Sequence, residues 1–208
     1  MAQDKLLYLA LGDSYTIGEA VDADKTWPKL LSDNLNQRGV KIQLDKIIAK
    51  TGWTTDELLV AIEDEESLKN TKFDIVSLLI GVNNQYRGYG IKQYEKEFEL
   101  LLKKAINLAG NKVSKVFVVS IPDYGVTPFA LENNKNSDLI AQELYKYNSI
   151  AKNISDEYGV RFFDITPISL KAIWKKDFVA EDKLHPSAKM YADWVEYIEP
   201  GVFQLLKD

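Results

Sequence analysis

The stretch Leu6-Leu-Tyr-Leu-Ala-Leu-Gly-Asp-Ser-Tyr-Thr-Ile-Gly18 begins as an apolar run and ends in polar residues and glycine. The run Leu6–Leu11 has the length and composition of a buried strand. It stops abruptly at Gly12-Asp13-Ser14, so a serine hydroxyl follows the carboxyl end of that strand. In open α/β sheets this edge is where sites are built. The stretch therefore predicts a functional site that contains Ser14.

Apolar runs of strand length alternate with helical patterns along the rest of the chain. Further strands are predicted over Val40–Ala49, Phe73–Ile80, Val116–Ile121 and Val160–Ile165. Helices are predicted over Asp24–Arg38, after the Thr54–Glu57 capping box, over Ile91–Leu108 and Leu139–Tyr158, and from Pro186 until Pro200-Gly201. Pro122–Asn136 has no clear period and is interpreted as a long loop. This alternation predicts one α/β domain over residues 1–208, with helices on both faces of a parallel sheet.

Composition and charge exclude several classes of protein. The 208 residues carry a net charge of −5, which argues against a nucleic-acid partner and against docking on anionic lipid. The chain has no cysteine and one histidine, so thiolate and His-rich metal sites are excluded. No segment approaches the ~18 apolar residues of a membrane helix. We therefore predict a soluble protein with neither metal nor cofactor.

The cellular compartment stays open. The start Met1–Lys5 lacks a basic region followed by an apolar one, so no export signal is visible. The protein is cytoplasmic if Met1 is the native start. It is periplasmic or secreted if a leader has been removed. The sequence makes no prediction of oligomeric state.

The single histidine is the only imidazole that can activate Ser14. A serine alone is a poor nucleophile and needs a base nearby. His185 lies in Asp182-Lys-Leu-His-Pro-Ser187, so a carboxylate comes three residues before it. These residue types predict Ser14 as nucleophile, His185 as general base and Asp182 as the group that orients the imidazole. Asp13, next to the serine, is interpreted as a residue that braces the loop.

Four motifs in order, Gly-Asp-Ser, a loop glycine at Gly52, Gly81-Val-Asn83 and Asp182-x-x-His185, resemble those of the GDSL esterases, also called SGNH hydrolases. The resemblance runs from Ser14 to His185, nearly the whole chain. It implies a flavodoxin-like three-layer α/β/α sandwich with five parallel strands. It also implies hydrolysis of carboxylic esters, with an oxyanion hole formed by Ser14, Gly52 and Asn83.

One position departs from the family pattern. The family usually has Gly-x-Asn-Asp, whereas this chain has Gly81-Val-Asn-Asn84. Asn83 is retained. The departure puts in doubt whatever loop contact the aspartate normally makes.

Aromatic side chains near these loops are predicted to line a substrate pocket: Tyr15, Trp53, Tyr86 and Tyr124, with Tyr89 and Phe129 as further candidates. The segment Tyr86–Gly90 is interpreted as a flexible lid or rim. The apolar content of the loops favours a medium acyl chain.

Several functions stay open. The ester is a lysophospholipid or another short or medium acyl ester, with acetyl esters of sugars and acyl thioesters as alternatives for the same site. A different class is a flavodoxin-like binding module in which Gly12–Gly18 holds a phosphate. The chain has neither a Walker lysine motif nor Gly-x-Gly-x-x-Gly, so this alternative is less favoured. A third is an inactive hydrolase that serves as a scaffold.

Overall fold

Five parallel strands form the central sheet of the computed structural model, which describes residues 5–207. The strands lie in the order β2-β1-β3-β4-β5. Their bounds are β1 (Leu6–Gly12), β2 (Ile42–Ala49), β3 (Ile75–Leu79), β4 (Val116–Val119) and β5 (Arg161–Phe163). The start of the chain, Met1–Asp4, in which no export signal is predicted, lies outside the described residues.

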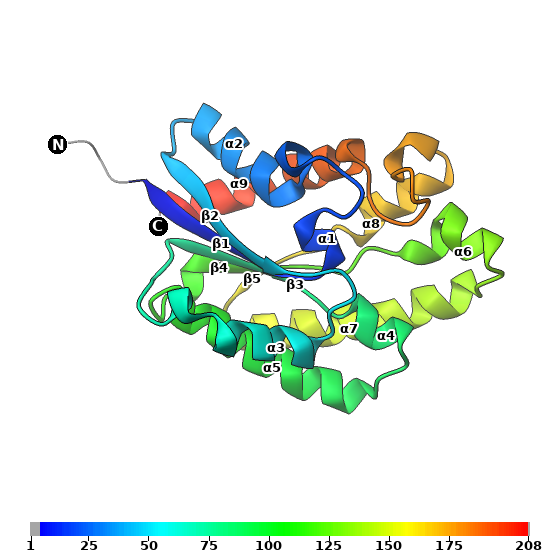
Figure 1. Ribbon diagram of the computed structural model, residues 1–208, viewed down its shortest axis with the longest axis horizontal. Helices are drawn as coiled ribbons and strands as arrows, with labels where there is room; N and C mark the ends of the chain where they lie inside the picture. The colour runs from blue at the N-terminus through cyan, green and yellow to red at the C-terminus, as the bar shows by residue number, and fades with distance from the viewer. Residues whose placement is uncertain (1–4, 208) are drawn as a thin grey trace.

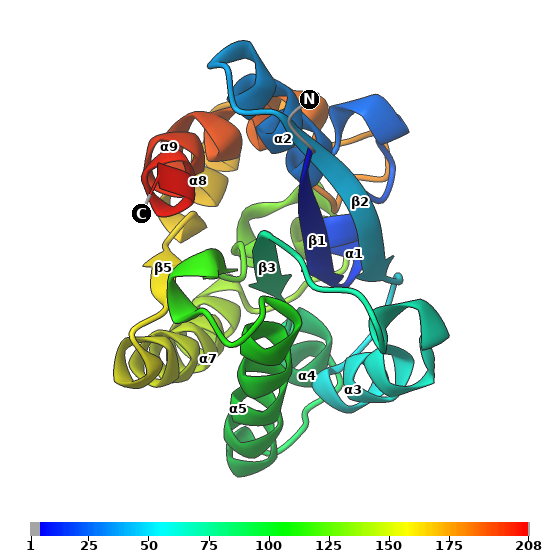
Figure 2. The ribbon, with the colours of Figure 1, turned by 90° about the vertical axis from the view of Figure 1, so that its left-hand side faces the viewer.

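Helices cover both faces of this sheet and complete a three-layer sandwich (Figures 1 and 2). One face carries α2 (Trp27–Gln37) and α9 (Ala188–Lys207). The other carries α3 (Thr55–Asp64), α5 (Ile91–Leu108) and α7 (Ser137–Tyr158). The layers and the strand order confirm the predicted flavodoxin-like α/β fold. No helix within residues 5–207 is both long enough and apolar enough to cross a membrane.

Shorter helices lie in the connections, most of them at the carboxyl edge of the sheet on the right of Figure 1. They are α1 (Ser14–Ile17), α4 (Val82–Tyr86), α6 (Pro128–Glu132) and α8 (Thr166–Ser169). Single 3₁₀ turns occur at Ala23–Lys25, Glu66–Leu68, Val113–Lys115, Tyr124–Val126, Leu170–Ile173 and Lys176–Phe178.

The core includes the whole of β3, in which every residue is buried. A strand covered on both faces has no polar side, so its sequence is nearly all apolar. The exception, Ser77, pairs its hydroxyl with the hydroxyl of Tyr8 on β1 at 2.8 Å. The buried strands thus keep their few polar groups paired.

Three strands end side by side where the site is expected. Gly12, the last residue of β1, is in register with Ala49 of β2 and Leu79 of β3. Gly12 has no room for a side chain, since a Cβ there would lie 2.2 Å from Thr16 Oγ1 and 2.4 Å from the Leu79 carbonyl oxygen. The glycine lets the chain turn tightly from β1 into α1. The loops that carry Ser14, Gly52 and Asn83 consequently start from adjacent strand ends.

Two helix boundaries differ from prediction. The helix predicted from Asp24 begins at Trp27, because Thr26 is its cap and Pro28 lies in its first turn; Ala23–Lys25 is a separate 3₁₀ turn. The last helix does not end at Pro200-Gly201 but continues to Lys207. Its buried apolar stripe crosses the proline without a break, and Gly201 lets it approach Phe163 of β5, where a Cβ would lie 2.6 Å from the ring.

The segment predicted as a long loop, Pro122–Asn136, contains helical structure. A 3₁₀ turn covers Tyr124–Val126, and α6 follows at once. Thr127 caps α6 by accepting a hydrogen bond from the Ala130 N–H, and Pro128 is its first residue. The Thr-Pro pair is the signal in the sequence that could have located this helix.

Candidate active site

Ser14 is the first residue of α1, directly after β1. Asp13 caps this helix, its Oδ1 accepting a hydrogen bond of 3.0 Å from the Tyr15 N–H. Gly18, with φ of +78°, ends α1 after a single turn. Asp13 thus braces the loop that presents Ser14, as its interpretation from the sequence proposes.

Asp13 is completely buried, and this changes its titration. Burial raises the pKa of its carboxyl to about 7. Hydrogen bonds from backbone N–H groups, chiefly that of Tyr15, lower the pKa but do not outweigh burial. In the unfolded chain the ordinary pKa is 3.8. Between these values the unfolded chain releases a proton that the folded protein keeps. Raising the pH therefore favours the unfolded state in this interval.

We expect Asp13 to lower the free energy of unfolding between pH 4 and pH 7, by an amount on the order of 4 kcal/mol. Asp13→Asn removes this titration. The free energy of unfolding of the wild type minus that of the variant should therefore fall as the pH rises, and level off above pH 7. Urea denaturation of both proteins across the interval measures this difference. Parallel curves for the two proteins would contradict the assignment.

The turn Asp182–His185 joins a carboxylate to the imidazole. His185 Nδ1 lies 2.5 Å from Asp182 Oδ2, and Oδ1 of the same carboxylate accepts the His185 N–H at 3.0 Å and the Leu184 N–H at 2.9 Å. Lys183, between them, has φ of +67°, a left-handed conformation that folds the turn back on itself. The three-residue spacing seen in the sequence thus produces direct contact of the two side chains.

Asp182 remains ionised in this turn. Burial acts to raise the pKa of its carboxyl, but the hydrogen bonds from His185 and from the two backbone N–H groups outweigh burial and hold the pKa below its ordinary value. An ionised carboxylate only accepts hydrogen bonds. Nδ1 of His185 is therefore the donor in this contact, which leaves Nε2 of the neutral ring as an acceptor.

Helix α6 holds the Asp182–His185 turn in place. The Phe129 N–H donates to the Lys183 carbonyl at 2.9 Å, and Lys183 Nζ pairs with Glu132 at 2.8 Å. On the other side, the Ala180 N–H donates to the His185 carbonyl at 2.8 Å. The sequence gives no sign of the contacts with α6, because they join segments about fifty residues apart in a region predicted as loop.

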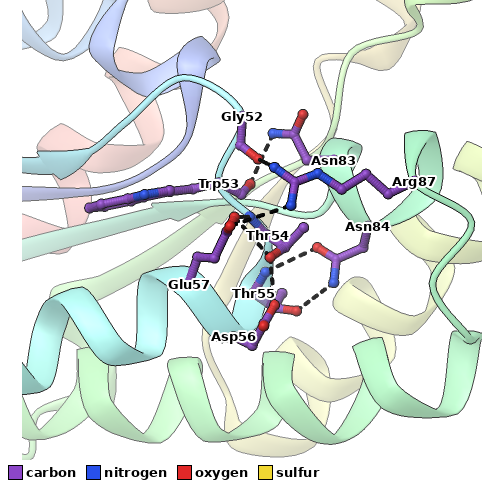
Figure 3. A network of polar contacts seen from close by, with 9 residues as sticks. All are labelled: Gly52, Trp53, Thr54, Thr55, Asp56, Glu57, Asn83, Asn84 and Arg87. Carbon is purple, nitrogen blue, oxygen red and sulfur yellow. Dashed lines mark hydrogen bonds and ion pairs between the residues drawn. The ribbon is translucent and has the colours of Figure 1, made fainter.

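The loops with Gly52 and Asn83 are bonded to each other, as Figure 3 shows. Asn83 Nδ2 donates to the Trp53 carbonyl at 2.9 Å, and Arg87 Nη2 donates to the Gly52 carbonyl at 2.6 Å. Gly52 has φ of +86°, a conformation that side chains disfavour. The structure thus brings together the two loops that the sequence proposes for the oxyanion hole.

Asn84, which replaces the usual aspartate, makes a defined contact in this chain. It is fully buried; its Oδ1 accepts the Thr55 N–H at 3.0 Å, and its Nδ2 donates to Thr55 Oγ1 at 2.6 Å (Figure 3). Thr55 Oγ1 in turn donates to Glu97 of α5. The second of these bonds needs an amide, since a carboxylate cannot donate. In this chain Asn84 therefore links α4 to the start of α3 and, through Thr55, to α5.

Ser14 and His185 lie on the wall of one cavity of about 180 Å³. The remaining lining consists of the polar side chain of Asn83 and of apolar or aromatic residues: Tyr15, Val82, Tyr86, Tyr124, Phe129 and Leu184. The Tyr15 ring meets the imidazole edge to face, with centroids 5.6 Å apart. Tyr86 and Tyr124 meet in the same way at 6.1 Å. The cavity is thus shaped for an apolar group beside the serine.

Three of the aromatic residues proposed for the pocket or its rim lie differently from expectation in this structure. Trp53 is not part of the lining; its carbonyl binds Asn83, while its indole points away from Asn83 in Figure 3. Tyr89 is likewise absent from the lining. Tyr86, predicted in a flexible loop, is the last residue of α4. Position in the sequence near a site loop did not determine where these side chains point.

Comparison with known proteins gives the family of this chain. Residues 10–192 match the GDSL-like Lipase/Acylhydrolase family. The chain belongs to this family. An arylesterase of Vibrio mimicus is 25% identical over 201 residues, which cover 95% of this chain and 87% of that protein. Members of this family hydrolyse esters, and this chain is an ester-hydrolysing enzyme.

Solved structures agree on the fold. The esterase EstA from Pseudoalteromonas, in a form inhibited by monoethylphosphonate, aligns with a TM-score of 0.72 at 18% identity over 98% of this chain and all of that one. A lipase/acylhydrolase from Enterococcus faecalis aligns with a TM-score of 0.73 at 16% identity over 96% of each chain. The resemblance seen in the sequence is confirmed for this esterase, and the flavodoxin-like binding module is not supported.

Proposed function

We propose that this esterase hydrolyses carboxylic esters through Ser14, His185 and Asp182. The observation that carries the proposal is the 2.5 Å contact between His185 Nδ1 and Asp182 Oδ2, with His185 and Ser14 on the wall of one cavity. Because Nδ1 donates its hydrogen to the Asp182 carboxylate in a hydrogen bond, Nε2 of the same neutral ring is free to accept a proton. A serine hydroxyl and an oriented base are the parts that nucleophilic catalysis needs.

The reaction has two halves. Ser14 Oγ attacks the ester carbonyl carbon while His185 Nε2 takes the hydroxyl proton. The resulting tetrahedral intermediate expels the alcohol, which receives that proton from the imidazolium, and leaves an acyl group on Ser14. Water then attacks the acyl carbon while His185 takes its proton; the bond from the acyl carbon to Ser14 Oγ breaks, the imidazolium returns the proton to Oγ, and the acid is released. Asp182 stabilises the imidazolium in both halves and keeps its own charge.

The oxyanion of the intermediate needs fixed donors. The N–H groups of Ser14 and Gly52 and the side-chain amide of Asn83 are the candidates. Asn83 Nδ2 carries two hydrogens, one of which is donated in a hydrogen bond to the Trp53 carbonyl. The other is available to the substrate, and the bond to Trp53 fixes its direction. Loss of one such donor typically lowers turnover about 10²–10³-fold.

The cavity favours a small apolar acyl or aryl group. An apolar cavity of about 150 Å³ holds one benzene molecule, so a cavity of about 180 Å³ suits a group of similar size. The aromatic lining and the arylesterase relative point in the same direction. We therefore favour short acyl or aryl esters over lysophospholipids. Sugar acetates and acyl thioesters remain alternatives for the same residues, and the absence of a metal or cofactor stays a prediction.

A panel of p-nitrophenyl esters from acetyl to long acyl chains, with an acyl thioester, an acetylated sugar and a lysophospholipid, tests the proposal. We expect the highest kcat/KM for acyl groups of about two to six carbons, because longer chains exceed the cavity. A fluorophosphonate probe should label the protein once, at Ser14. Labelling at another serine would overturn the site. A folded protein without turnover or labelling would favour the inactive scaffold.

A further inference from the structure

Gly52 is the proposed oxyanion donor with the weakest local support. It lies between β2 and α3, in a connection that belongs to no helix or strand. Glycine has the freest backbone of all residues, and it has no side chain through which packing could fix its orientation. Within the turn the Trp53 N–H donates to the Lys50 carbonyl at 3.2 Å, and the Gly52 carbonyl of the same peptide accepts a hydrogen bond from elsewhere in the molecule.

Helix α4 and Arg87, the residue that follows it, supply such bonds. Arg87 binds the Gly52 carbonyl, Asn83 binds the Trp53 carbonyl, and Asn84 binds Thr55 at the start of α3 (Figure 3). The first of these, at 2.6 Å, is the one made to Gly52 itself. A Cβ built on Gly52 would have Arg87 Nη2 as its neighbour, at 3.5 Å. The guanidinium thus lies directly against the glycine.

Glu57 orients the guanidinium. Arg87 Nη1 lies 3.4 Å from Glu57 Oε1, while Glu57 Oε2 accepts the Thr54 N–H at 2.8 Å. Burial acts to raise the pKa of Glu57, but hydrogen bonds from Thr54 and the Arg87 charge hold it below its ordinary value, so Glu57 stays charged. The planar fork of arginine contacts the carbonyl and the carboxylate at once, which the single ammonium of lysine cannot reproduce.

The exposure of this pair argues against a role in stability alone. The side chains of Arg87 and Glu57 are 41% and 39% exposed. Ion pairs as exposed as this contribute little to folding stability. What the pair does fix is the orientation of one glycine carbonyl beside the site.

We infer that Arg87 is a positioning residue for the oxyanion hole and acts through Gly52. Held at its carbonyl, Gly52 keeps one backbone conformation, and its N–H keeps one direction. Without the guanidinium the Gly52–Trp53 peptide keeps the bond from the Trp53 N–H to the Lys50 carbonyl but loses the bond to its own carbonyl, so the Gly52 N–H turns away from the oxyanion for part of the time. Neither Arg87 nor Gly52 is among the residues that line the cavity, and the inference therefore rests on the bond between them. The inference rests on the proposed function, in which Gly52 is an oxyanion donor.

The test compares Arg87→Ala, Arg87→Lys and Glu57→Gln with Lys104→Ala. Lys104 forms another exposed ion pair with α3, to Glu63 at 2.9 Å, and is the matched control. Glutamine at position 57 keeps the capping box but removes the charge that orients Arg87. For a p-nitrophenyl ester, Arg87→Ala should lower kcat about 10- to 100-fold, which is less than the loss of kcat expected when one oxyanion donor is removed entirely. KM and Tm should stay near the wild-type values. Glu57→Gln should show a smaller loss in the same direction.

Rescue separates positioning from a general structural effect. Arg87→Lys should recover part of kcat, and guanidinium ion at millimolar concentration should raise kcat of Arg87→Ala but not of Lys104→Ala. A kcat of Arg87→Ala equal to that of the control would overturn the inference. A lower Tm of Arg87→Ala together with a lower kcat that neither lysine nor guanidinium ion restores would also overturn it. So would a rise in KM of Arg87→Ala at unchanged kcat. If the wild type itself is not labelled at Ser14, the proposed function has failed, independently of Arg87.

Discussion

Replacing Ser14 with alanine is expected to lower ester turnover by roughly 10⁶-fold, the scale on which serine hydrolases lose activity without their nucleophile. The change removes Oγ from the cavity wall but leaves the oxyanion donors and the substrate cavity in place. Binding of substrate should therefore persist, with KM changed little while kcat collapses. Steady-state kinetics with a p-nitrophenyl ester, together with loss of fluorophosphonate labelling, measures the effect.

Ser187→Ala is the control for this experiment. Ser187 lies two residues after His185, but its hydroxyl donates to the Asp177 carbonyl and does not line the cavity. Its variant should keep turnover and labelling near those of the wild type. Substantial turnover by Ser14→Ala, or labelling that survives in it, would show that another group is the nucleophile.

Replacing His185 with alanine is expected to have an effect of similar size and to change the pH profile as well. The chain contains one histidine, but the buried carboxyl of Asp13, with a pKa of about 7, also titrates near neutrality, so the rise of activity with pH that is due to the imidazole is the part that Asp13→Asn retains. That rise should disappear in His185→Ala. In Asp182→Asn, turnover should fall about 10⁴-fold, because the amide no longer selects the tautomer with a proton on Nδ1. The dependence of kcat/KM on pH measures both changes.

Asp177→Asn is the control for charge in the same region. Asp177 pairs with Lys189 on the surface at 2.6 Å and lies away from the imidazole contact. Its variant should keep the wild-type profile. If His185→Ala retained the rise with pH and near-normal turnover, another residue would be the base, and the family resemblance would then apply to the fold alone.

The residues closest to the chemistry were predictable because they lie in short motifs. Gly12-Asp13-Ser14 ends a buried strand, and the two partners Asp182 and His185 meet through a turn of four residues. That the strands are parallel follows from the alternation of elements, since parallel strands need helical crossovers, whereas the flavodoxin-like arrangement came from the family resemblance. Local sequence therefore contains both the reacting groups and the sheet that carries them.

The surroundings of these residues were not predictable in the same way. The anchoring of Lys183 by Phe129 and Glu132 joins α6 to the turn across the structure. The direction of the Trp53 indole and the continuation of α9 beyond Pro200 depend likewise on which side chains lie opposite. Such contacts depend on tertiary packing, which neither the period nor the composition of a segment specifies.

The side-chain bonds from Asn84 through Thr55 to Glu97 form a chain of donors. The Asn84 amide donates a hydrogen bond to the threonine hydroxyl, and the hydroxyl donates to the Glu97 carboxylate, while the Thr55 N–H donates back to Asn84 Oδ1. A threonine hydroxyl has a single hydrogen to donate. With aspartate at position 84, two carboxylates would compete for that hydrogen. The residue types at positions 84 and 97 are therefore coupled through one hydroxyl group.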